Sequence, residues 1–227
     1  MLCMGEISPQ LADNEAWVDQ TFEKCDDILH RQVYLGQGRQ EGLLVYVEVA
    51  VSNLMLEEHV IGLSDVQPLK SYTEGKAALL AGNGLLFLDG DTNCYKISSK
   101  GYPGLGVKKA ENEKVIRGSQ EAFTESEKIN VALIRKRLRD SRMKVEEQTV
   151  GVRSHTMTAL VYMEDLIYQG LLTTMKQQLQ RYEIDGILDS GMLEQLSEKH
   201  WLSPFPQFQT TERPDRAAAA VLEGRIV

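Results

Sequence analysis

The chain has 227 residues, of which 42% are hydrophobic and 26% charged, and its net charge is −8. This composition is typical of globular proteins, and the length allows one large domain or two of about 100 residues each. The acidic balance excludes an ordinary nucleic-acid-binding protein, which needs a basic face, so we expect no nucleic-acid partner.

Membrane insertion, secretion and disulfide bonding are also excluded. The longest apolar run, residues 43–51, contains Glu48 and is much shorter than the roughly 20 residues of a membrane-spanning helix. The first 13 residues lack the basic and apolar segments of a secretory signal. Three widely separated cysteines favour neither a disulfide framework nor a zinc site, and they suit a reducing compartment.

The first part of the chain alternates between helix and strand patterns. Apolar side chains at helical spacing predict a helix over residues 14–32. Asp89 and Gly90 predict a hairpin turn between two short strands. The elements expected after the first helix are a strand at 43–49, helices at 53–61 and 73–81, and strands at 85–88 and 95–97. Residues 108–118 are rich in charge and suit a linker.

A second set of elements follows. Thr124 and Glu127 form a capping-box pattern that opens a helix with a broad apolar stripe ending at Leu138. Pro214 occupies a favoured first position of a helix that runs to Gly224, with Asp215 complementing its positive end. Between these helices the patterns predict strands at 145–150 and 157–163, helices at 171–182 and 191–199, and an extended segment at 203–206.

Two short sequences recur in the same order. The strand sequence Leu-Val-Tyr-Val-Glu from Leu44 returns as Leu-Val-Tyr-Met-Glu from Leu160, and the alanine-rich sequence that ends at Gly82 returns ending at Gly224. Chance similarity of apolar strands and alanine-rich helices is the alternative explanation. The common order of elements favours two related subdomains, with both tyrosine-bearing strands central in their sheets and an insertion at about 185–208. The repeat also predicts that residues 226–227 begin a strand without its hairpin partner, poorly ordered or paired to a neighbouring molecule.

We therefore predict a mixed α/β (α+β) fold. It has two small α/β subdomains, residues 1–107 and 119–227, joined by a linker at 108–118. Two linked lobes of this kind are reminiscent of two-lobed substrate-binding proteins.

The side chains that could take part in catalysis do not occur in a catalytic pattern in this sequence. The four histidines have no metal-ligand spacing, and no serine, threonine or cysteine lies in a nucleophile-elbow pattern. The acidic pairs Glu146-Glu147 and Glu164-Asp165 lie on expected strands, where neighbouring side chains point to opposite faces. We therefore expect no enzyme, no cofactor and no metal site.

Six cations fall within ten residues of this acidic chain: Arg135, Lys136, Arg137, Arg139, Arg142 and Lys144. One interpretation is a docking patch for anionic lipid headgroups or an acidic partner. The other is a solvated helix end, where cations complement the negative end of the helix dipole.

Several motifs of the second part have a characteristic order. They are Ile116-Arg117-Gly118, Glu121-Ala122-Phe123-Thr124-Glu125, the run from Ile184 to Gly191, Ser203-Pro204-Phe205-Pro206, and Thr211-Glu212-Arg213-Pro214-Asp215. In this order they resemble the GerA family, the A subunits of nutrient germinant receptors in endospore-forming bacteria. The resemblance covers residues 115–227 and extends less tightly back to residue 22. The sequence departs from the family at Ser119, Gln120 and Ala122, where a Gly-Pro-Arg-Glu-Gly-Phe-like run is usual.

The resemblance implies a membrane complex with B and C subunits that senses nutrients and starts germination. The chain would be the soluble part of the A subunit at the cytoplasmic face of the spore inner membrane, with self-association of A subunits as a further expectation. The motif residues are candidates for ligand or interface contacts, although turn and helix-start roles explain many of them. They are Arg117, Gly118, Phe123, Thr124, Glu125, Asp185, Asp189, Ser190, Glu212, Arg213 and Asp215.

Two functions follow from these patterns. The first is a signal-coupling domain that acts through subunit contacts or subdomain movement. The alternative is a small-molecule-binding domain that holds the germinant between two lobes, because ligands favour such clefts.

Overall fold

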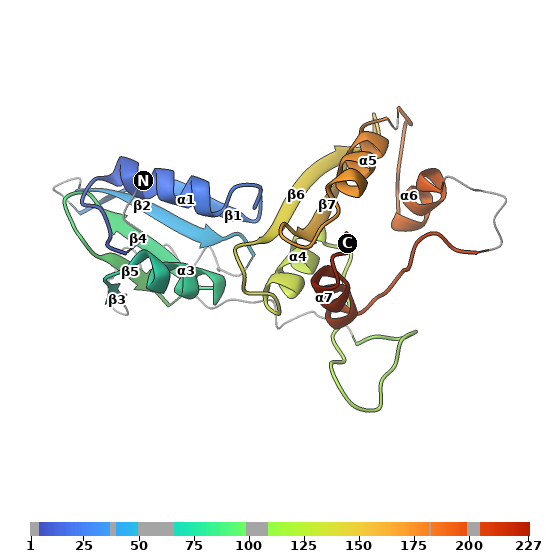
Figure 1. Cartoon of the computed structure of the whole chain (residues 1–227), viewed down its shortest axis with the longest axis horizontal. Helices are drawn as coiled ribbons and strands as arrows, with labels where there is room; N and C mark the ends of the chain where they lie inside the picture. The colour runs from blue at the N-terminus through green and yellow to red at the C-terminus, as the bar shows by residue number, and fades with distance from the viewer. Residues whose placement is uncertain (1–4, 37–39, 50–65, 99–108, 182, 199–204) are drawn as a thin grey trace.

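The computed structural model describes the chain except for residues 1–4, 37–39, 50–65, 99–108, 182 and 199–204. We call residues 5–98 the first half and residues 109–227 the second half; they lie side by side in Figure 1. Within the described ranges, none of the helices combines the length and hydrophobicity that crossing a membrane requires. The expected helix at 53–61 lies outside the described residues.

The first half is built on a five-stranded antiparallel sheet in the order β1-β2-β4-β5-β3. Residues 43–45 and Val47 of β2 are buried, because this strand is interior and both its faces are covered. A continuous apolar run is the sequence pattern of such a strand. The strands are β1 (Ile28–Leu35), β2 (Gln40–Val47), β3 (Val66–Leu69), β4 (Gly84–Leu88) and β5 (Cys94–Ile97).

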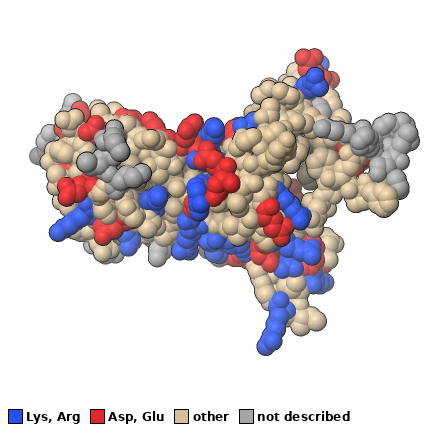
Figure 2. Space-filling model, viewed as in Figure 1, with Lys and Arg blue, Asp and Glu red and all other residues tan. Residues whose placement is uncertain are grey.

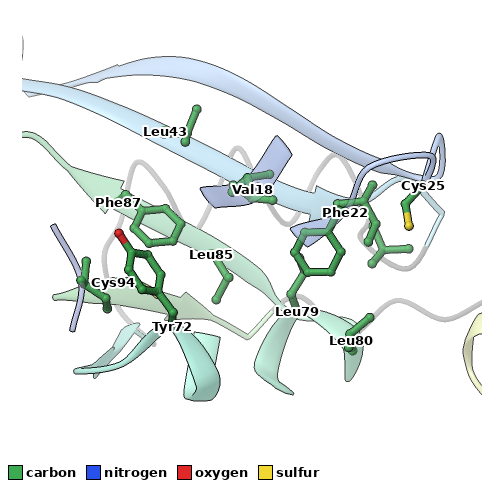
Figure 3. Packing of buried hydrophobic residues seen from close by; sticks show 14 residues of the cluster. Val18, Phe22, Cys25, Leu43, Tyr72, Leu79, Leu80, Leu85, Phe87 and Cys94 are labelled. Atoms are coloured by element: carbon green, nitrogen blue, oxygen red, sulfur yellow. The ribbon is translucent and has the colours of Figure 1, made fainter. Parts of the chain in front are cut away.

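Helices α1 (Leu11–Thr21) and α3 (Tyr72–Leu80) share one apolar core with this sheet. Figure 3 shows Val18 of α1 and Leu79 of α3 close to Leu85 and Phe87 of β4. The Tyr72 hydroxyl donates to the side-chain oxygen of the fully buried Asn14 at 2.7 Å, so the two helices are also joined by a polar contact.

The second half is built on one antiparallel hairpin, β6 (Met143–Val150) and β7 (Thr156–Met163). Helices α4 (Glu127–Arg135) and α7 (Pro214–Leu222) share a core with one face of the hairpin, which includes Val161. Helix α5 (Gln169–Gln180) packs on the other face, against Leu160 and Tyr162. Helix α6 (Ser190–Ser197) lies within the predicted insertion.

The structure shows correspondences between the two halves beyond those found in the sequence. Helix α7 begins and ends 142 residues after α3, and α4 begins 116 residues after α1. Val45 of β2 pairs with Leu85 of β4, and their counterparts Val161 and Val227 exchange two backbone hydrogen bonds of 2.7 and 2.9 Å. The second sheet has fewer strands, as predicted.

Two details of the repeat prediction are wrong. Val227, predicted to be poorly ordered or paired to a neighbouring molecule, pairs with Val161 of the same chain. Strand β2 is central, but β7 has β6 as its one neighbouring strand among the described residues. The division at residues 108–118 stays a prediction.

The first predicted helix is too long. Helix α1 ends at Thr21, and residues 28–35 form β1, which pairs with β2 along its whole length. Lys24 has a φ of 59°, which reverses the chain between them. The apolar positions of β1 also fit helical spacing, so the pairing with β2 decides the structure.

The predicted capping box is also wrong. Helix α4 begins at Glu127, after Ser126. The Thr124 amide donates instead to the Asn130 side chain at 2.7 Å, and the Thr124 hydroxyl accepts from the Ser126 amide at 3.2 Å. Strand β3 was not predicted. The other predicted helices and strands that lie within the described residues are confirmed, with ends shifted by a few residues.

Candidate functional site

The two halves meet at a short backbone contact that we call the joint: residues 24–27, Arg135 and Val145. The turn after α1 runs beside β6 as a parallel bridge between Cys25 and Val145. The Val145 amide donates to the Lys24 carbonyl, and the Asp26 amide donates to the Val145 carbonyl, each at 2.9 Å. These bonds join the sheets of the two halves at one point.

A buried ion pair closes the joint. The Arg135 guanidinium, at the end of α4, donates two hydrogen bonds of 2.8 Å to the two carboxylate oxygens of Asp27. Its remaining nitrogen donates to the carbonyls of Asp140 and Met143, each at 3.1 Å. Arg135 is 0% exposed and Asp27 is 5% exposed, so the pair is shielded from water.

The electrostatics of the joint keep this arginine charged. Burial alone would lower the pKa of Arg135, but the attraction and hydrogen bonds of Asp27 outweigh it and leave the pKa above its usual value. Burial raises the pKa of the neighbouring Cys25 thiol, whose Sγ lies 3.5 Å from the Met143 carbonyl oxygen. Removing one partner of such a pair would leave an uncompensated buried charge, which is strongly destabilising.

Several carboxylates lie at the edge of the joint, which we call the rim: Asp26, Glu48, Glu127 and Glu147. The Asp26 carboxylate accepts from the Glu147 amide at 2.7 Å, and Lys128 of α4 pairs with Glu48 after β2 at 2.5 Å. Burial, and then the charge of Glu147, raises the pKa of Glu127. Burial also raises the pKa of Glu147. This edge therefore holds more negative charge than one lysine compensates.

A small hollow lies between the halves at this rim. Val47 and Glu48 line it from the first half, and Lys128, Val131 and Glu147 from the second. Its cavity volume is about 10 Å³, far below the roughly 300–1,000 Å³ of a typical small-molecule pocket. This hollow is therefore too small to hold a nutrient molecule in the state described.

A second cluster joins residues 112–113 to the family motif that begins at Thr211. The Glu113 carboxylate accepts from the Thr211 hydroxyl at 2.5 Å and the Glu212 amide at 3.2 Å, and it pairs with Arg216. The Glu212 carboxylate in return accepts from the amides of Asn112 and Glu113 at 2.6 and 2.5 Å. Hydrogen bonds, from the Thr211 hydroxyl first, hold the pKa of Glu113 below its usual range. Residues 112–113 and residues 211–216 are thus held together by reciprocal carboxylate contacts.

The neighbouring candidates complete this cluster. The Phe123 amide donates to the Glu212 carbonyl at 2.8 Å, and the Phe123 side chain packs against the α4–α7 core. Arg213 binds the Asp215 carboxylate through two hydrogen bonds of 3.1 and 2.5 Å and holds the pKa of Asp215 below its usual range. Four candidates, Phe123, Glu212, Arg213 and Asp215, therefore lie together.

The other candidates lie elsewhere. Asp185 forms an exposed ion pair with Arg153 at 3.2 Å. Asp189 caps α6 by accepting from the Met192 amide at 2.7 Å, and Ser190 is the first residue of that helix. Arg117 and Gly118 are exposed at the tip of a loop, Glu125 is exposed, and Thr124 is bonded to Asn130.

The six cations do not form one basic surface. Arg135 is fully buried in the joint, and Lys144 is 4% exposed, so both are wrong as members of a docking patch. Lys136 and Arg137 pair with Glu121, and Arg142 pairs with Asp140 and Asp165. Arg139 is exposed. Local carboxylates thus offset most of this charge.

Sequence reasoning missed Asp26, Asp27 and Glu113. The two aspartates fell inside the predicted first helix. Aspartate is a poor helix former, so two in succession were a signal that the helix had already ended. Glu113 fell in the expected linker, and its partners lie about a hundred residues away. No local sequence pattern therefore predicts these contacts.

Comparison with known proteins agrees with the motif resemblance. The family model described as Bacillus/Clostridium GerA spore germination protein matches residues 16–227. The chain is 32% identical over 242 residues to the uncharacterized membrane protein YfkQ of Bacillus subtilis (strain 168), covering 97% of this chain and 47% of that protein. It is 29% identical over 244 residues to spore germination protein KA of the same strain, covering 97% and 45%. The chain thus spans about half the length of the curated relatives it matches.

Among solved structures, the chain resembles the N-terminal domain of the A subunit of the Bacillus megaterium spore germinant receptor GerK3. The TM-score is 0.72 at 24% identity, over 99% of this chain and 92% of that one, so the fold is shared. The family match covers nearly the whole chain and confirms the resemblance of the motifs. The chain therefore belongs to the Bacillus/Clostridium GerA spore germination protein family.

Proposed function

We propose that the chain is the coupling part of a germinant receptor A subunit, in which the contact between the two halves carries the signal. The observation that supports this function is the joint. Each apolar core cluster draws its residues from one half, whereas a β-bridge and the Asp27–Arg135 pair cross between the halves. A bidentate ion pair has two discrete arrangements, formed and separated, which a switching element needs.

In this proposal the chain acts with B and C subunits at the cytoplasmic face of the spore inner membrane. It works by contact and movement and not by catalysis. The support comes from the family: similar proteins bear names such as spore germination protein KA, and the structural neighbour is part of the A subunit of a spore germinant receptor. The Glu113–Glu212 cluster, which fastens residues 112–113 to the motif that begins at Thr211, is a surface from which subunit contacts can be made.

The rim ion pair offers a test that leaves the buried pair intact. Glu48 and Lys128 lie on opposite halves, and their side chains are 29% and 44% exposed, so reversing either charge should change the stability of the domain by less than about 1 kcal/mol. We expect Glu48→Lys or Lys128→Glu in the full-length A subunit to slow nutrient-triggered germination of spores that contain no other receptor. The double reversal should restore the rate, because it rebuilds the pair.

Arg153 and Asp185 supply the matched control. They form an ion pair within the second half, at 80% and 78% exposure, and Arg153 is not one of the motif candidates, so Arg153→Asp should leave the germination rate unchanged. Equal rates in the parent and both single Glu48 and Lys128 variants would contradict coupling through the joint. Calorimetry of the chain against amino acids, sugars and salts examines the alternative, because saturable heat would place nutrient binding in this domain.

A further inference from the structure

A loop of the second half projects from the rest of the molecule. We call residues 109–121 the arm; it is the yellow-green loop that extends beyond α7 in Figure 1. Its two ends are held together by a bridge between Lys109 and Glu121 and by a hydrogen bond of 3.1 Å from the Ala110 amide to the Gln120 carbonyl. The arm is thus a closed loop with a narrow base.

Both limbs of the arm are fastened to the rest of the second half. Glu113 and Asn112, on its first strand-like limb, bond to Thr211, Glu212 and Arg216 at the start of α7. Its second limb ends at Glu121, whose carboxylate pairs with Lys136 and Arg137. Three acidic side chains at or near the base, Glu113, Glu121 and Glu212, are therefore already occupied by partners of this chain.

The tip has a different composition from the base. Ile116 is 104% exposed, an extreme value for a large apolar side chain, and Lys114 and Arg117 on either side of it are also exposed. Gly118 has a φ of 128°, a conformation that favours glycine, and a Cβ there would lie 4.0 Å from a Val115 methyl group. The glycine thus turns the chain two residues after the fully exposed Ile116.

We propose that the tip of the arm, residues 114–118, inserts Ile116 into the headgroup region of an anionic lipid bilayer. The charges are complementary: two cations flank the apolar side chain, and residues 114–118 contain no carboxylate, although the chain as a whole carries −8. Figure 2 shows a cationic side chain extending from the end of this projection. An apolar side chain between basic residues is the pattern of interfacial membrane contacts.

The size of the tip favours a lipid surface over a protein. A specific protein interface buries about 800 Å² on each partner, which a convex tip of five residues does not offer by itself. A bilayer accepts a small protrusion, and each basic residue near an anionic surface strengthens the binding about fivefold, the equivalent of about 1 kcal/mol. Binding of one tip is then weak, and it becomes effective in a protein that other parts hold near the membrane.

Co-sedimentation with vesicles tests this contact directly. The chain is mixed with vesicles of phosphatidylcholine alone, or with one quarter phosphatidylglycerol, at millimolar lipid and at two salt concentrations. We expect binding to the anionic vesicles only, weakened several-fold by raising the salt from 0.15 to 0.5 M because the charges are screened. Ile116→Asp should lower the partition coefficient more than tenfold, and Arg117→Gln about fivefold.

The matched control is Leu188→Asp, which makes the same change at a residue that is 78% exposed in another part of the second half. This variant should bind as the parent does. Because Ile116 and Leu188 are both exposed, circular dichroism and melting temperature should be unchanged in either variant. Equal binding by the parent and Ile116→Asp would overturn the proposal, and so would failure of the parent to bind anionic vesicles at millimolar lipid; either result would make a protein partner the remaining explanation of the exposed tip.

Discussion

The two halves share one order of elements but cover their central hairpins differently. In the first half β2 lies between β1 and β4, whereas in the second half β7 pairs with β6 and, among the described residues, otherwise with Val227. The second hairpin instead has helices on both faces. Leu79 and Val221, which are counterparts in α3 and α7, are both 0% exposed. The two halves therefore share the packing of a helix on the sheet, whereas their sheets differ in the number of strands among the described residues.

The joint breaks the likeness of the halves. Arg135 is fully buried against Asp27 of the other half. Its counterpart 116 residues earlier is Asp19, which is exposed on α1. The same position of an equivalent helix thus faces solvent in one half and the neighbouring half in the other, so the contact between the halves is asymmetric.

The largest expected effect comes from removing Arg135. Arg135→Ala should lower the free energy of unfolding by about 3–5 kcal/mol, because it leaves the Asp27 carboxylate buried without a partner. Urea denaturation measures the change. Asp19→Ala, at the equivalent exposed position, should change the free energy by less than about 0.5 kcal/mol. Similar values for the two variants would contradict the asymmetry of the joint.

The next effect compares the two cores. Leu79→Ala should cost about 2–5 kcal/mol and Val221→Ala about 2 kcal/mol, because both leave cavities at fully buried positions. In a Trp201→Phe background, Trp17 fluorescence reports on the first half and far-ultraviolet circular dichroism on the whole chain. We expect each variant to lower one common midpoint, since the joint couples the halves. Two separate midpoints would show that the halves unfold independently.

A smaller effect is expected at the second sheet. Deleting Val227 removes its two backbone hydrogen bonds to Val161 and should cost about 1 kcal/mol, since this pairing lies at a strand edge. Hydrogen exchange of the Val161 amide should accelerate, while that of its counterpart Val45 should not change. Unchanged exchange at Val161 would remove the strongest structural argument for the repeat.

The smallest effect concerns the acidic rim of the joint. The pKa of Glu127 is raised in the folded chain, so its protonated form stabilises the fold below the unfolded pKa of about 4.3, and this contribution is lost as pH rises through the folded pKa. Glu127→Gln should therefore be more stable than the parent at pH 7, by a few tenths of a kcal/mol after solvent screening, and equally stable near pH 4. Glu125→Gln, at an exposed position nearby, should show no such pH dependence.

Local patterns predicted the elements that depend on local chemistry. The buried run of β2, the serine-capped α3 and the proline-led α7 carry their signals in neighbouring residues. Strand β1 was missed because its apolar residues also fit a helix, and only pairing with β2 separates the two structures.

The candidate site was harder to predict than the fold. Arg135 was one of six similar cations, and the carboxylate that singles it out is 108 residues away. The motif resemblance identified Phe123, Glu212, Arg213 and Asp215 together. Glu113, which accepts hydrogen bonds from Thr211 and Glu212, has no distinctive neighbours in the sequence. A charged side chain reveals its role only when its partner is known.

Under the proposed coupling function, the bidentate geometry of Asp27 and Arg135 determines how often the joint opens. Both hydrogen bonds are 2.8 Å and leave together when the halves rotate apart. Every 1.4 kcal/mol or so that this separation costs lowers the open population about tenfold at equilibrium. A bound partner that contacts only the open form would need to favour it by a comparable energy to make it the major species. In the proposed coupling function, the response of the chain therefore depends on how strongly such a partner prefers the separated halves.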